Sequence, residues 1–156
     1  MAIQYVNGDA TEPIGVGTKI IVHIVNDLGA WGSGFVLSVS ARWPEPKAAY
    51  MLSKERNNLI LGNVQLVSVE SGRLDESIFV ANLVGQSGLK GPSNPRPVQY
   101  PAVEDGLCKI ATEARKIGAS VHMPRIGCAR GGSKWSQMEP IIARALDGIS
   151  VTVYDL

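Results

Sequence analysis

Residues 19–27 read Lys-Ile-Ile-Val-His-Ile-Val-Asn-Asp, a nearly unbroken run of β-branched side chains that ends in two turn-forming residues. Such a run predicts a buried strand. Apolar runs at 62–69, 77–84, 120–123 and 150–154 predict further strands, and a short one precedes Asn7. Strands that are apolar on both faces are typical of a parallel or mixed sheet with helices on both sides.

Helical patterns separate these strands. Residues 102–117 carry apolar side chains at three- and four-residue spacing and stop at Gly118, a typical C-terminal residue. Three other helical patterns span 35–43, 46–52 and 139–146, and the first of them stops before Pro44. A long loop covers 85–101. This order predicts an α/β fold, a three-layer α/β/α domain around a central mixed sheet.

Composition sets limits on function. The 156 residues are 45% hydrophobic and include 15 basic and 14 acidic side chains, a formal charge of +1. That balance argues against a strongly basic nucleic-acid-binding protein. No apolar run reaches the roughly 18 residues of a membrane helix, and the first residues do not resemble a signal peptide. We therefore expect a cytoplasmic protein without a membrane partner, and two cysteines predict neither a disulfide framework nor a metal site.

Glycine clusters lie at 29–34, 85–88 and 127–133, where predicted strands end and helices begin. Glycine lets the backbone approach a ligand closely, and the N–H groups at a helix start suit phosphate. Neither a Walker A sequence nor a Gly-x-Gly-x-x-Gly fingerprint is present. The clusters are therefore either ordinary tight turns or the two walls of a diphosphate site. Lys90 and Arg96 in the long loop read as solvent-exposed side chains.

Polar residues near the end of the first long strand are candidates for a site. Asn26 offers a donor and an acceptor, as a ribose diol requires. His23 is either a satisfied core residue or a catalyst, and strict alternation puts it on the opposite face from Asn26 unless the strand bends. Asp9 either caps a turn or accepts a hydrogen bond from an exocyclic amine such as that of adenine.

Four segments together resemble the macrodomain family. They are Asn-Gly-Asp-Ala-Thr at 7–11, His-Ile-Val-Asn at 23–26 with Gly-Ser-Gly at 32–34, Met-Pro-Arg-Ile-Gly-Cys at 123–128, and Val-Thr-Val-Tyr-Asp-Leu at 151–156. The branch that they resemble contains the terminal ADP-ribose protein glycohydrolase and the fungal ADP-ribose 1''-phosphate phosphatase. The resemblance runs from Ile3 to Leu156, so we expect residues 1–156 to form a single macrodomain.

The resemblance implies a site for ADP-ribose. Asp9 would bind the adenine amino group beside the Ala10 backbone, Asn26 would hold the distal ribose, and Phe35 would lie near that ribose. The diphosphate would lie between two loops, with Gly32, Ser33 and Gly34 on one side and Ile126, Gly127, Cys128, Ala129 and Arg130 on the other.

This sequence also departs from the human glycohydrolase. The catalytic lysine of that enzyme falls near Gly85 or Gln86 here, and its aspartate falls at Gly131, which disfavours a lysyl-adduct mechanism. His23 is shared with the fungal phosphatase, in which the resemblance implies a chemical role for it.

Three functions follow from the resemblance. The first is hydrolysis of the ester between ADP-ribose and a protein Glu or Asp, with Asn26 positioning the ribose, His23 or Asp27 as titratable groups, and Gln86 positioning water. The second is an ADP-ribose 1''-phosphate phosphatase that uses His23 near its ordinary pKa. The third is a non-catalytic reader. The expected partners are ADP-ribose and mono-ADP-ribosylated proteins, with no nucleic acid and no cofactor, and we expect a monomer.

Overall fold

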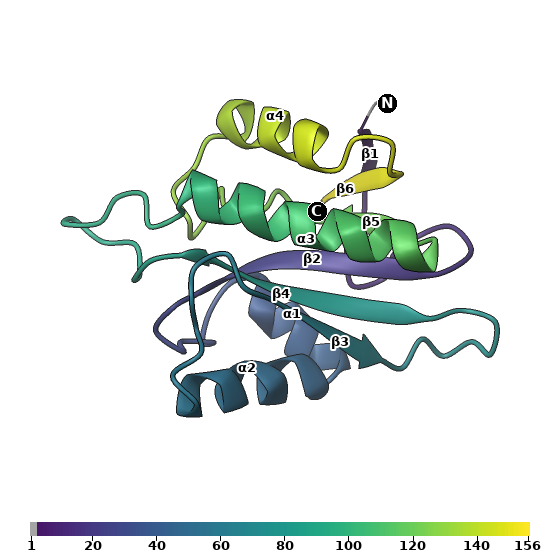
Figure 1. Cartoon of the computed structure of the whole chain (residues 1–156), viewed down its shortest axis with the longest axis horizontal. Helices are drawn as coiled ribbons and strands as arrows, with labels where there is room; N and C mark the ends of the chain where they lie inside the picture. Colours follow the sequence, from purple (N-terminus) through teal and green to yellow (C-terminus); the bar gives the residue numbers. More distant parts are fainter. Residues whose placement is uncertain (1–2) are drawn as a thin grey trace.

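The computed structural model describes residues 3–156 as a six-stranded sheet with helices on both faces (Figure 1). The strands are β1 (Gln4–Asn7), β2 (Lys19–Asn26), β3 (Val64–Val69), β4 (Ile78–Gln86), β5 (Ser120–Met123) and β6 (Val151–Asp155). The helices are α1 (Phe35–Arg42), α2 (Glu45–Glu55), α3 (Tyr100–Ile117) and α4 (Trp135–Ala145).

The strand order across the sheet is β1-β6-β5-β2-β4-β3. Every neighbouring pair is parallel except β3 and β4, which form an antiparallel hairpin. Helices α3 and α4 cover one face, and α1 and α2 cover the other (Figure 1). The predicted three-layer fold with a mixed sheet is therefore confirmed.

The composition of β2 follows from its central place between two cores. Ile20 and Val22 point into the core beneath α3 and α4. Ile21 and Val25 point into the core beneath α1 and α2. All four side chains are almost completely buried. A strand with water on one face would alternate with polar residues, whereas this one needs apolar side chains on both faces.

Several boundaries differ from the prediction, including the end of α2, which runs to Glu55 instead of residue 52. The loop expected at 85–101 is shorter, because Gln86 belongs to β4 and α3 begins at Tyr100. Pro101 fits in the first turn of α3, where its missing N–H has no helical partner to lose. Helix α4 begins at Trp135 instead of 139. Proline often occurs at the start of a helix, but Pro140 lies inside α4.

The end of β2 is irregular. Val25 pairs with Val84 but Asn26 pairs with Gln86, so the pairing slips by one residue in β4. The extra residue, Gly85, belongs to β4. His23 and Asn26 both contact the layer of α1 and α2, although strict alternation along β2 would separate them. The sequence left open whether these two side chains share a side of the sheet, and in the structure both reach the layer of α1 and α2. None of the helices within residues 3–156 is long and apolar enough to cross a membrane.

Candidate functional site

A cleft runs along the ends of the central strands and consists of three connected hollows. We name them the Asn26 hollow, of about 290 Å³, the His23 hollow, of about 190 Å³, and the Asp9 hollow, of about 270 Å³. Each adjoining pair has lining residues in common. The first two share Ser33, Gln86 and Arg130, and the last two share Phe35, Arg125 and Ala129. One elongated ligand could therefore occupy all three.

The two predicted glycine loops form opposite walls of the His23 hollow. Gly34 precedes α1 with a φ of 84°, and no side chain caps this helix, so its first N–H groups are free to bind a ligand. On the other wall, a Cβ on Gly131 would overlap the carbonyl oxygen of Gly127. The Arg130 side chain crosses between the walls, since its Cγ lies 3.3 Å from the position of a Cβ on Gly34.

His23 lies beneath this hollow as a neutral imidazole. The Asn82 amide fixes its tautomer, because Nδ2 of Asn82 donates to the Pro46 carbonyl at 2.9 Å and leaves Oδ1 facing the ring. His23 Nε2 therefore donates to that oxygen at 2.6 Å, and the buried Nδ1 is a bare acceptor without a partner among residues 3–156. Burial lowers the pKa of His23 to about 4. The expectation of an ordinary pKa at this residue is wrong.

Asn26 braces the loop that carries the first glycine cluster. Its Oδ1 accepts hydrogen bonds from the backbone N–H groups of Leu28 and Ala30 at 3.0 and 3.1 Å, and its Nδ2 donates to the Ala30 carbonyl at 2.8 Å. The Tyr50 hydroxyl donates to the Asn26 backbone carbonyl at 2.6 Å and lies 2.8 Å from the same Oδ1, and burial raises the pKa of Tyr50 to about 12. One Nδ2 hydrogen of Asn26 has no part in this bracing.

Asp27 and Gln86 differ in their access to the cleft. The Asp27 carboxylate accepts the backbone N–H of Gly88 at 2.9 Å and does not line the Asn26 hollow. Asp27 therefore holds the loop that follows β4 in place. The Gln86 amide lines both the Asn26 and His23 hollows, and its Nε2 donates to the Gly88 carbonyl at 3.3 Å. Lys90, which the sequence assigns to solvent, is exposed but also lines the Asn26 hollow.

At the other end of the cleft, Asp9 caps a turn. Its Oδ1 accepts both the N–H and the hydroxyl of Thr11 at 2.8 Å, which confirms the turn interpretation and leaves Oδ2 for a ligand. Ala10 and Cys128 line the same hollow. Burial raises the pKa of the Cys128 thiol, so a thiolate nucleophile is disfavoured. Phe35 lines the Asp9 and His23 hollows, the second of which adjoins the Asn26 hollow.

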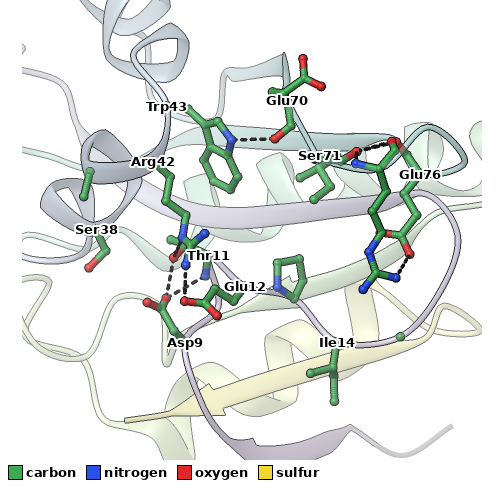
Figure 2. Close-up of a pocket in the computed structure, with 16 residues that line it drawn as sticks. Asp9, Thr11, Glu12, Ile14, Ser38, Arg42, Trp43, Glu70, Ser71 and Glu76 are labelled. Atoms are coloured by element: carbon green, nitrogen blue, oxygen red, sulfur yellow. Dashed lines mark hydrogen bonds and ion pairs between the residues drawn. The ribbon is translucent and has the colours of Figure 1, made fainter.

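A larger hollow, of about 1050 Å³, lies between residues 9–15, the end of α1 and the turn before β4 (Figure 2). Four acidic and two basic residues line it: Arg42 bonds Glu12 and Arg73 lies 3.6 Å from Glu76, whereas Asp9 and Glu70 have no ion-pair partner among residues 3–156. This acidic excess makes the hollow a poorer candidate than the cleft for a ligand that contains a diphosphate. Within residues 3–156, no group of three or more His, Cys, Asp or Glu side chains is arranged to hold a metal ion.

Two solved structures are similar to this chain over nearly its whole length. A protein of unknown function from Bacteroides thetaiotaomicron is 46% identical with a TM-score of 0.91, and the match covers 100% of this chain and 99% of that one. A macrodomain protein from Streptomyces coelicolor is 47% identical with a TM-score of 0.85, covering 99% of both chains.

Two curated relatives are much longer than this chain. The chromodomain-helicase-DNA-binding protein 1-like of Danio rerio is 36% identical over 98% of this chain, which spans 15% of that protein. The DNA ADP-ribosyl glycohydrolase of Mycobacterium tuberculosis is 27% identical over 97% of this chain, which spans 42% of that protein. No family model matches the sequence. The near-complete overlap with the Streptomyces macrodomain, at 47% identity and with the same fold, shows that this chain belongs to the macrodomain family.

Proposed function

We propose that this chain binds ADP-ribose in the cleft and hydrolyses the bond that joins ADP-ribose to acidic protein side chains. The observation that carries the proposal is the meeting of two glycine loops, one of them opening a helix without a side-chain cap, next to Asn26. The relative named DNA ADP-ribosyl glycohydrolase supports a hydrolase of ADP-ribosyl groups.

The three hollows fit the three parts of this ligand. The diphosphate would lie in the His23 hollow, where the backbone N–H groups of α1 and the facing loop supply donors. The distal ribose would lie in the Asn26 hollow, and the adenine would lie in the Asp9 hollow with its amino group toward Oδ2 of Asp9. Binding through backbone amides needs few cationic side chains, in keeping with the formal charge of +1.

Hydrolysis would break the bond between C1'' of the distal ribose and the acyl oxygen. The electron pair leaves with the carboxylate, water adds its oxygen to the oxocarbenium-like carbon, and the water proton passes to the diphosphate and then to solvent. A carboxylate leaves without protonation, so the reaction does not require an acid at His23. Gln86 would orient the water through its amide, and Asn26 would hold the ribose.

A non-catalytic reader is the second candidate. Among residues 3–156, no carboxylate or imidazole lines the Asn26 hollow, so no described side chain there is an ordinary general base. The neutral His23 also argues against the phosphatase alternative, since that mechanism needs an imidazole that titrates near pH 7.

Turnover of matched substrates tests the proposal. Release of ADP-ribose is measured from a Glu-linked peptide, from ADP-ribosylated DNA and, as phosphate, from ADP-ribose 1''-phosphate. We expect release from the peptide, a loss of at least tenfold in kcat for Gln86→Ala with ADP-ribose affinity within about threefold, and loss of both binding and turnover for Asn26→Ala. Asn58→Ala, in an exposed loop, is the control.

The outcomes separate the candidates. ADP-ribose binding without turnover of any substrate would make the protein a reader. Release from DNA alone would contradict the assignment to acidic side chains, and phosphate release alone would favour the phosphatase.

A further inference from the structure

Two cationic side chains from different loops line the Asn26 hollow. Lys90 comes from the loop at 87–99 and Arg130 from the loop at 124–134. Among residues 3–156, neither has a carboxylate within 4.0 Å, since the ion pairs all involve other cations. The other lining residues are uncharged: Ile24, Val25, Asn26, Ala30, Gly32, Ser33, Val36, Gln86 and Leu89. The hollow therefore has uncompensated positive charge.

The loop that carries Lys90 is braced by hydrogen bonds. Gly88 donates its N–H to the Asp27 carboxylate at 2.9 Å, and Ser87 donates its N–H to the Pro97 carbonyl at 2.9 Å. Asn94 closes the loop by donating from Nδ2 to the Ser87 carbonyl at 2.9 Å. Lys90 is thus held beside the hollow by the backbone around it.

The two loops that carry Lys90 and Arg130 are rich in basic residues. The two loops together contain five basic residues and no acidic one, although the whole chain has 15 basic and 14 acidic side chains. The five are Lys90, Arg96, Arg125, Arg130 and Lys134. Arg125 is compensated by Asp155 at 2.6 Å, at the Asp9 end. Of the five, only Lys90 and Arg130 line the Asn26 hollow, and the Asp27 carboxylate, which bonds the Gly88 N–H of the Lys90 loop, does not line it.

We propose that Lys90, together with Arg130 at the boundary with the His23 hollow, forms an anion subsite in the Asn26 hollow. This inference rests on the proposed placement of the distal ribose. The subsite takes an oxyanion on the group attached to C1'', either the phosphate of ADP-ribose 1''-phosphate or a carboxylate beside the modified residue of a peptide. Leu89, 51% exposed and lining the same hollow, suits the aliphatic part of a peptide better than a polynucleotide.

Lys90 separates this subsite from the diphosphate site. Arg130 lines both the Asn26 and His23 hollows, so its removal would weaken every ligand that contains a diphosphate. Lys90 lines only the Asn26 hollow of the cleft. A change at Lys90 is therefore expected to affect only ligands with an anion beyond the distal ribose.

Calorimetric titrations of wild type and Lys90→Gln test this selectivity. The probes are ADP-ribose, ADP-ribose 1''-phosphate, and non-cleavable ADP-ribosyl peptides with either glutamate or glutamine beside the modified position. We expect Lys90→Gln to weaken the 1''-phosphate or the glutamate-flanked peptide about tenfold, with ADP-ribose and the glutamine-flanked peptide within twofold. The arm that loses affinity identifies the source of the anion. Lys116→Gln, on the exposed end of α3, is the control.

Equal weakening of all probes, or of none, would overturn the subsite. So would a loss confined to an ADP-ribosylated DNA duplex, which would assign Lys90 to a polynucleotide. Binding of the probes without turnover of any substrate would refute the proposed hydrolase. The ratio of wild-type to Lys90→Gln affinity for each probe would still test the subsite. Failure of every probe to bind would refute both.

Discussion

Two buried histidines make the stability of this protein sensitive to mild acid. His23 donates from Nε2 to Asn82 at 2.6 Å, and burial lowers its pKa to about 4. His122 lies between the Ser120 and Tyr154 hydroxyls, each at 2.7 Å, and burial together with the nearby Lys19 lowers its pKa to about 4. Both imidazoles are therefore neutral in the folded protein at pH 5, where an unfolded chain would protonate them.

The sign and size of the effect follow from linkage. The unfolded state, with a histidine pKa of 6.5, binds protons that the folded state refuses, so the free energy of unfolding falls as the pH falls below 6.5. With a folded pKa of about 4, each histidine contributes a loss of about 2 kcal/mol between pH 7.5 and pH 5. The two together give a slope of about 2.4 kcal/mol per pH unit near pH 5.

Urea denaturation followed by tryptophan fluorescence measures this loss at several pH values. Trp31 is a suitable reporter, since it is buried and its ring centroid lies 5.4 Å from that of His23. We expect His23→Gln and His122→Gln each to remove about half of the histidine slope, whatever their stability at pH 7.5. The carboxylates titrate alike in all three proteins and cancel in the comparison. A wild-type slope equal to those of the variants, or a His23 pKa above 6 by NMR, would refute this account.

Two further substitutions test the cleft. Gly131→Ala places a Cβ against the Gly127 carbonyl, so we expect ADP-ribose affinity to fall at least tenfold in calorimetry and the midpoint of unfolding to drop. Gly91→Ala, with open space around it, is the control. Unchanged binding in Gly131→Ala would contradict the close approach of the two glycines. Tyr50→Phe removes the hydroxyl that bonds Asn26. We expect the free energy of unfolding, measured by urea denaturation, to fall by about 1–2 kcal/mol and ADP-ribose to bind more weakly. Wild-type values for both quantities would show that this hydrogen bond is not needed to hold Asn26.

The fold could be predicted from periodicity because the physical requirement is local. A central strand such as β2 needs apolar side chains on both faces, and Gly118 ends α3 in the left-handed conformation, with a φ of 67°. The glycine loops were also predictable as a pair, since both follow strands whose ends meet at one edge of the sheet.

The chemical state of the site residues was not predictable in this way. His23 is neutral because Asn82, 59 residues away on β4, fixes its tautomer. Asn26 is committed to loop bracing partly by Tyr50 from α2. Both contacts depend on tertiary packing between segments far apart in the sequence, which no periodicity records. The position of Lys90 depends on its braced loop, although the absence of acidic residues from 86–99 was a usable signal.

The central claim is that ADP-ribose occupies the cleft between the glycine loops. It is tested most directly by titrating ¹⁵N-labelled protein with ADP-ribose and mapping the amide shifts by NMR. The account predicts the largest changes at Gly34, Phe35 and Gly127, on the two walls of the His23 hollow. Changes centred on Arg42 and Trp43 in the larger hollow (Figure 2), or no change at a saturating concentration, would contradict it.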